Sequence, residues 1–154
     1  MRPSAVLPAI LVTATLAGVA QAAVPTVRSP NAQTLSLARG RGLAIVALKG
    51  SILGRLRRGR VIVMIPERSS AVAHVYGAEH KHRLNAHAML YRGSRLRYRI
   101  FGGRWRIRLR GGGVNAGAAG RGWFGLDGDR GTYSIAGRSP RHWPSAYRTF
   151  DLGI

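Results

Sequence analysis

The sequence predicts an all-β domain, a single compact antiparallel barrel or sandwich of about seven to nine strands. Strand-like segments recur along the chain, and turn signals separate them at intervals of about 8 to 12 residues. No long segment after residue 22 repeats its apolar residues with the period of a helix. The chain of 154 residues contains no cysteine, so burial and backbone pairing must supply its stability, which favours a closed or two-layered sheet.

A secretory signal is predicted over residues 1–22. Arg2 precedes a mostly apolar run from Ala5 to Ala20, and Ala20-Gln21-Ala22 fits the small-x-small pattern of signal peptidase. The apolar run is shorter than the roughly 18 to 20 residues of a permanent membrane helix. We therefore expect a helical signal peptide, cleaved between Ala22 and Ala23, and a chain that is secreted or lies in the periplasm or cell envelope. Residues 23–33 are predicted to be a leader or linker, and residues 34–154 the single all-β domain.

The domain is predicted to begin with two buried strands, Leu43–Leu48 and Val61–Ile65, which are short runs rich in Val, Ile and Leu. A basic segment between them, Gly54–Arg60, is predicted to be a solvated connection that carries Arg55, Arg57, Arg58 and Arg60. A further strand is predicted at Val72–Tyr76, inside a weakly patterned stretch from 66 to 94. The remaining strands are predicted at 95–101, 104–110, 121–126, 132–136 and 147–152, with glycine-rich turns at 102–103, 111–113 and 128–131.

The clearest local pattern lies at residues 95–110, where two alternating apolar and basic runs flank Gly102-Gly103. Paired glycines tolerate the positive φ of a two-residue hairpin turn. The predicted hairpin has an apolar face that pairs Ile100 with Trp105, Tyr98 with Ile107, and Leu96 with Leu109. Its other face is a plate of arginines that pairs Arg99 with Arg106, Arg97 with Arg108, and Arg95 with Arg110, with Arg104 at the rim. Like charges placed opposite one another are destabilising, but rows of guanidinium forks suit phosphate, sulfate or carboxylate. Two interpretations stay open, an anion-binding site and a solvated outer face.

The chain is strongly basic. It contains 25 lysine and arginine residues against 5 aspartate and glutamate residues, for a formal net charge of +20. Such an excess predicts attraction to an anionic polymer or an anionic membrane surface. Nucleic acid is expected to bind only non-specifically. A GC-rich genome also enriches arginine, so a purely compositional origin of the charge is the alternative.

No motif indicates catalysis, because the sequence has no G-x-S-x-G, no H-E-x-x-H and no cysteine nucleophile. We predict no catalytic residue and no cofactor. His80, His82 and His87 form a weak alternative metal site, since His80 and His82 would share one face of a strand. The neighbouring cations Lys81 and Arg83 oppose a bound dication.

Three further patterns are interpreted as structural. Gly120–Gly125 matches G-x-G-x-x-G outside a strand-helix context and is attributed to turn and strand-edge glycines. Asp127–Gly131 begins like a calcium loop, but Arg138 stands where the last glutamate would fall, so a hairpin turn is predicted. Trp143 is the aromatic residue best placed to be an exposed stacking platform, but a cap on one end of the barrel is the favoured interpretation.

Segment 38–65, the hairpin around Gly102-Gly103 and the run Gly122–Asp127 together resemble a family of small secreted β-rich proteins of actinobacteria. That family has no assigned activity. The resemblance implies export and a β fold, and it implies no functional residue.

These patterns together predict a non-enzymatic, exported binding or structural module. Its arginine-rich hairpin face and the basic segment Gly54–Arg60 would contact an anionic polymer or membrane surface. The alternative is a small cell-envelope enzyme or metal-binding protein that uses the histidine-rich segment. The oligomeric state is not predicted.

Overall fold

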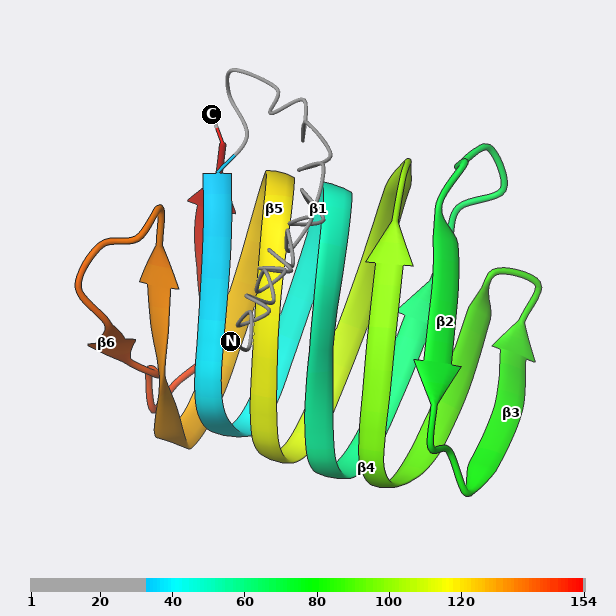
Figure 1. Ribbon diagram of the computed structural model, residues 1–154, viewed down its shortest axis with the longest axis horizontal. Coiled ribbons are helices and arrows are strands. Elements are labelled where there is room, and N and C mark those ends of the chain that lie inside the picture. The colour runs from blue at the N-terminus through cyan, green and yellow to red at the C-terminus, as the bar shows by residue number, and fades with distance from the viewer. Residues whose placement is uncertain (1–32, 154) are drawn as a thin grey trace, which may run out of the picture.

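The computed structural model describes residues 33–153, which form an antiparallel sheet of seven strands (Figure 1). The strands are β1 (Gln33–Met64), β2 (Val72–Tyr76), β3 (His80–Asn85), β4 (Ala88–Phe101), β5 (Arg104–Ile135), β6 (Arg141–His142) and β7 (Arg148–Leu152). The prediction of an all-β, antiparallel domain is confirmed. The predicted signal peptide and residues 23–32 of the predicted leader lie outside the described part of the chain, and Gln33 already belongs to β1.

Three strands, β1, β4 and β5, run through two facing layers of this one sheet. In Figure 1 they curve at the lower edge, where each passes between the front and the rear layer. The front layer consists, in order, of β2, 94–101, 51–58, 113–120, 33–40, 132–135 and β6. The rear layer consists of β3, 88–92, 60–64, 104–110, 43–49, 121–127 and β7. β1 and β5 thus wind together around the core as an antiparallel ribbon. The sheet is not closed. The structure is therefore not a closed barrel, which was one of the two architectures predicted from the sequence.

The strands change layer at paired glycines. At the lower edge Gly93, Gly59, Gly111, Gly42 and Gly128 lie side by side on successive strands, and at the opposite edge Gly50 faces Gly120. Gly59 and Gly111 have φ values of +145° and +150°, a conformation that is essentially restricted to glycine. A Cβ on Gly59 would come within 2.9 Å of the Gly111 Cα. The sharp bend therefore depends on backbones that touch without side chains between them.

The apolar alternation reverses at the lower edge, which keeps apolar side chains inside both layers. Around the first corner of β5, the buried residues are Trp105, Ile107 and Leu109 before it, and Val114, Ala116 and Ala118 after it. Just above the corners is an irregular row of four residues that fall outside the regular strand pairing: Arg39, Arg57, Arg95 and Gly113. Irregularities of this kind redirect the side chains that follow them.

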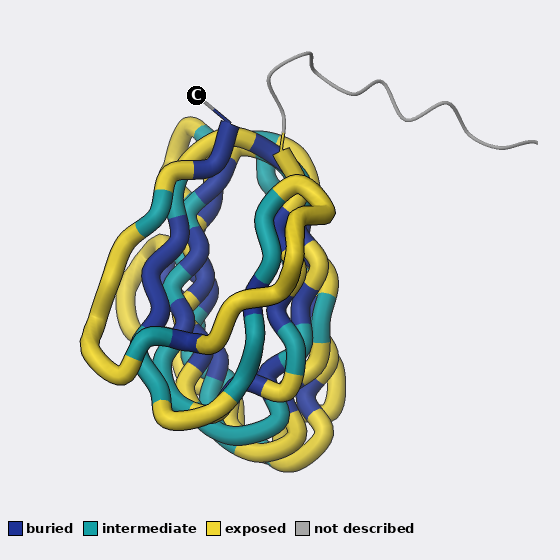
Figure 2. Tube along the Cα trace, turned by 90° about the vertical axis from the view of Figure 1, so that its left-hand side faces the viewer, coloured by how far each residue is buried: buried dark blue, intermediate teal, exposed yellow. Residues whose placement is uncertain are grey.

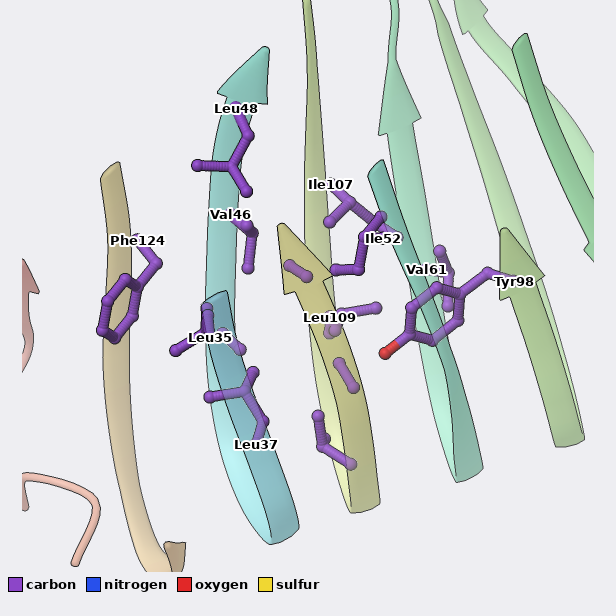
Figure 3. Packing of buried hydrophobic residues seen from close by; sticks show 14 of the residues in the cluster. Leu35, Leu37, Val46, Leu48, Ile52, Val61, Tyr98, Ile107, Leu109 and Phe124 are labelled. Carbon is purple, nitrogen blue, oxygen red and sulfur yellow. The ribbon is translucent and has the colours of Figure 1, made fainter. Parts of the chain in front are cut away.

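The core lies between the two layers (Figure 2). Figure 3 shows Leu35, Leu37 and Ile52 from the front layer against Val46, Ile107 and Leu109 from the rear layer. Tyr98 crosses over Gly54, and its hydroxyl donates to the carbonyl oxygen of Asn115 at 3.2 Å. Burial raises the pKa of Tyr98 well above its usual range. No charged residue of the described chain is buried.

Several predicted connections are wrong. The basic segment Gly54–Arg60 lies within β1, and the glycines at 111–113 and 128–131 lie within β5. A cluster of glycines has the same sequence pattern at a hairpin turn, where the chain reverses, and at a corner, where a strand bends into the facing layer. Only the pairing of strands that are distant in the sequence shows which of the two structures forms.

Trp143 is buried, with 6% of its surface exposed, so it is not a stacking platform. Its ring lies where a side chain on Gly40 or Gly131 would otherwise be, and its Nε1 donates to the carbonyl oxygen of Thr132 at 3.1 Å. The favoured interpretation, that Trp143 covers an end of the domain, agrees with this packing.

Candidate anion-binding site

The predicted hairpin around Gly102-Gly103 is not formed. β4 and β5 do not pair with each other, because segments of β1 lie between them in both layers. Gly102 and Gly103 have positive φ values, as predicted, but they carry the chain from the front layer to the rear layer. The inward faces were predicted correctly, since alternation is a local property of each strand. The partner of each strand is not local, and there the prediction failed.

The arginine plate is therefore split between the two outer faces. Arg95, Arg97 and Arg99 lie on the front layer, and Arg104, Arg106, Arg108 and Arg110 lie on the rear layer. New neighbours replace the predicted ones: Arg97 faces Arg55, and Arg60 stands between Arg92 and Arg110. None of the predicted arginine pairs exists, but both faces remain basic.

A pocket of about 840 Å³ gathers arginines from four segments of the front layer and its lower edge. Seven arginines line it: Arg39, Arg41, Arg55, Arg57, Arg95, Arg97 and Arg130. Leu56, Leu96, Gly113 and Asn115 complete the lining. Arginine and one amide make this lining suited to anions, because guanidinium groups donate paired hydrogen bonds to phosphate, sulfate and carboxylate.

The irregular row builds this pocket, since all four of its residues line it. Arg39 and Arg95 have φ values of 54° and 62°, a left-handed conformation that costs an arginine on the order of 1–2 kcal/mol. Among the described residues, Ala136 is the only other non-glycine with positive φ. Strained residues of this kind tend to cluster at functional sites.

Hydrogen bonds hold the strained positions in place. The backbone N–H of Arg39 donates to Asn115 Oδ1 at 3.1 Å, and Asn115 Nδ2 donates to the carbonyl oxygen of Gly113 at 3.0 Å. On the other side, Glu79 Oε1 accepts hydrogen bonds from the Ser94 hydroxyl at 2.6 Å and the Ser94 N–H at 3.0 Å. These bonds lower the pKa of Glu79 and fix the residue that precedes Arg95. The pocket wall is thus anchored on both flanks.

Six of the seven pocket arginines form no ion pair within the described residues; the exception is Arg41. Within residues 33–153 the single ion pair joins Arg41 to Asp129 at 2.7 Å, and both side chains are mostly exposed. Arg55 and Arg97 lie directly opposite each other, and such a pair costs on the order of 0.8 kcal/mol in water. A bound anion would remove this repulsion.

Four of the predicted anion-binding residues meet in the pocket, namely Arg55, Arg57, Arg95 and Arg97. The others, Arg58, Arg60, Arg99, Arg104, Arg106, Arg108 and Arg110, lie outside its lining. Three pocket residues were missed: Arg39, Arg41 and Arg130. Each stands next to a glycine, in Arg39-Gly40-Arg41-Gly42 and Arg130-Gly131, so arginine beside corner glycines is the signal that could have found them.

The three histidines of the alternative metal site do not belong to a metal-ligand cluster in the described part of the chain. No three histidine, aspartate or glutamate side chains of the described chain gather closely enough to hold a metal ion, and His80, His82 and His87 are all exposed. The predicted hairpin turn at Asp127–Gly131 is also wrong, since this segment bends within β5 between the layers.

Comparison of the chain with protein-family models, curated proteins and solved structures finds no match. The likeness to the actinobacterial family therefore stays a prediction. Residues 33–153 include no helix able to cross a membrane.

Proposed function

We propose that the protein is a non-enzymatic binding module that holds an anionic polymer in the arginine-lined pocket of its front layer. The observation that carries this proposal is the irregular row, which crosses four neighbouring strand segments and places the strained Arg39 and Arg95 at its two ends, around one pocket. A merely solvated face would need neither the left-handed conformation of Arg39 and Arg95 nor the anchoring at Asn115. The predicted export would bring the module to polymers of the envelope or the extracellular space.

A polymer fits this pocket better than a single small anion does. A phosphate or sulfate group engages two or three guanidinium groups, whereas seven arginines surround a volume of about 840 Å³. Arg99 continues the basic surface along β4 beyond the pocket. Several linked anionic groups would satisfy these side chains together.

The test compares two double variants with the same loss of charge. Arg55→Thr with Arg97→Thr alters the pocket, and Arg106→Thr with Arg108→Thr alters the rear face. Threonine preserves strand propensity at these exposed positions. Binding of polyphosphate, heparin, polygalacturonate and anionic vesicles is measured over a salt series for the parent and for both variants.

We expect the pocket variant to lose affinity for the bound polymer and to show a weaker dependence of log K on log salt, because each arginine removed takes away a contact that releases counterions. The rear variant should stay close to the parent. Equal losses in both variants would show that general charge, and not the pocket, binds the polymer. If the protein binds the anionic vesicles and none of the polymers, the ligand of the pocket is a membrane surface and not a polymer.

A further inference from the structure

A row of aromatic rings stands on the front face beside the pocket. His74 of β2 stacks on Tyr76 with ring centroids 6.2 Å apart and an interplanar angle of 14°, and on Phe101 of β4 at 6.1 Å and 27°. We call these three residues the ring stack. Tyr76 is 52% exposed and Phe101 is 38% exposed, so the structure holds two large rings in water.

The ring stack is continuous with the pocket. Tyr76 lies directly opposite Arg97, which lies opposite Arg55, and Arg55 lies opposite Asn115; the last three residues line the pocket. At the far end of the stack the guanidinium of Arg99 lies over the Phe101 ring, 5.1 Å from its centroid. The ring stack therefore begins beside the pocket arginines at Tyr76 and ends beside Arg99 at Phe101.

Tyr76 ends the stack on the side of the pocket. Its ring stacks with His74 at 6.2 Å between centroids, and within residues 33–153 no second ring stacks on it. The next residue, Gly77, packs against the backbone of Arg95, so Tyr76 ends β2 at the level of the pocket arginines. A planar group that stacks there would extend an existing column of parallel rings.

We infer that the polymer bound by this site is a single-stranded nucleic acid, with a base stacked on Tyr76 and the adjoining phosphates among Arg55, Arg95 and Arg97. This inference rests on the proposed function and specifies its ligand. A positively charged groove beside aromatic rings is the combination by which proteins bind single strands without sequence preference. Rings that already stack nearly parallel offer a planar base a further stacking partner, and every base has a face that can use it. A duplex keeps its base faces covered, so it cannot use Tyr76 in this way.

The experiment separates bases from charge. A labelled oligothymidylate and an abasic oligonucleotide of the same length carry the same phosphates, and their binding is compared by fluorescence anisotropy at a salt concentration that suppresses non-specific attraction. The protein is tested as the parent, as Tyr76→Leu and as Tyr76→Phe. Tyr76 is exposed and its hydroxyl is not needed for stacking, so both variants should fold and Tyr76→Phe should bind as the parent does.

We expect the parent to bind oligothymidylate on the order of tenfold more tightly than the abasic strand. Tyr76→Leu should abolish this preference without changing the affinity for the abasic strand. Equal binding of the two strands by the parent would overturn the inference, and so would equal binding of duplex and single strand, or tighter binding of heparin at matched charge.

Polyphosphate separates this inference from the proposed function, because it carries charge without rings. If Arg55→Thr with Arg97→Thr weakens polyphosphate binding while oligothymidylate shows no advantage, the pocket binds anions and only the assignment of the ligand is wrong. If that variant leaves polyphosphate binding unchanged, the proposed function itself fails.

Discussion

Gly111 lies where β5 bends from the rear layer into the front layer, with a φ of +150°. A Cβ at this position would come within 2.9 Å of the Gly59 Cα and 3.0 Å of the Arg58 carbonyl carbon. Both obstacles are backbone atoms of the facing strand, so no side-chain rotation relieves them. The unfavourable φ costs about 1–3 kcal/mol, and forcing the two strands apart costs about 1–3 kcal/mol more. We expect Gly111→Ala to lower the free energy of unfolding by about 2–6 kcal/mol.

The adjacent glycine supplies the control. A Cβ on Gly112 meets nothing within 4 Å, and its φ is not in the positive range, so Gly112→Ala should change stability by about 0.5 kcal/mol or less. Urea unfolding followed by tryptophan fluorescence measures both variants, and unchanged m-values show that the unfolded states are comparable. If Gly111→Ala unfolds at the same urea concentration as Gly112→Ala, the paired-glycine corner does not determine the bend.

Three further predictions concern the core and the titrating groups. Ile107→Ala should lower the free energy of unfolding by about 2–5 kcal/mol, whereas Ile62→Ala on the outer face should cost much less; urea unfolding distinguishes them. Burial raises the pKa of Tyr98 in the folded protein, so its stabilising contribution is complete below its ordinary pKa of about 10 and is lost as the pH rises above that value. Unfolding midpoints measured between about pH 9 and 11 should fall, and fall less in Tyr98→Phe. Hydrogen bonds from Ser94 lower the pKa of Glu79, so the contribution of Glu79 is present above its ordinary pKa of 4.5 and is lost as the pH falls below it. In Ser94→Ala an NMR titration should show the Glu79 pKa moving up toward that value.

The candidate site was only half predictable from the sequence. Arg95 and Arg97 were predicted on the outward face of a strand and Arg55 and Arg57 in a solvated connection, so all four were identified as exposed basic positions from charge and local pattern alone. Their meeting in one pocket was not predictable, since it depends on β1 lying between β4 and β5. The predicted plate used the nearest sequence neighbour as the strand partner. The ring stack was missed for the same reason: His74 and Tyr76 meet Phe101 only through the pairing of β2 with β4.

The sequence by itself determined the β class, the inward face of each segment and the basic outer surface. Alternating apolar residues define an inner face within a few positions of one another, so Leu96, Tyr98, Ile107 and Leu109 are buried as their spacing predicts. The tertiary structure alone decided that glycine clusters are corners and not turns, and which strands are neighbours. Both outcomes depend on contacts between residues far apart in the chain, such as Gly59 with Gly111, and the energy of those contacts appears only after the two layers have closed on their core.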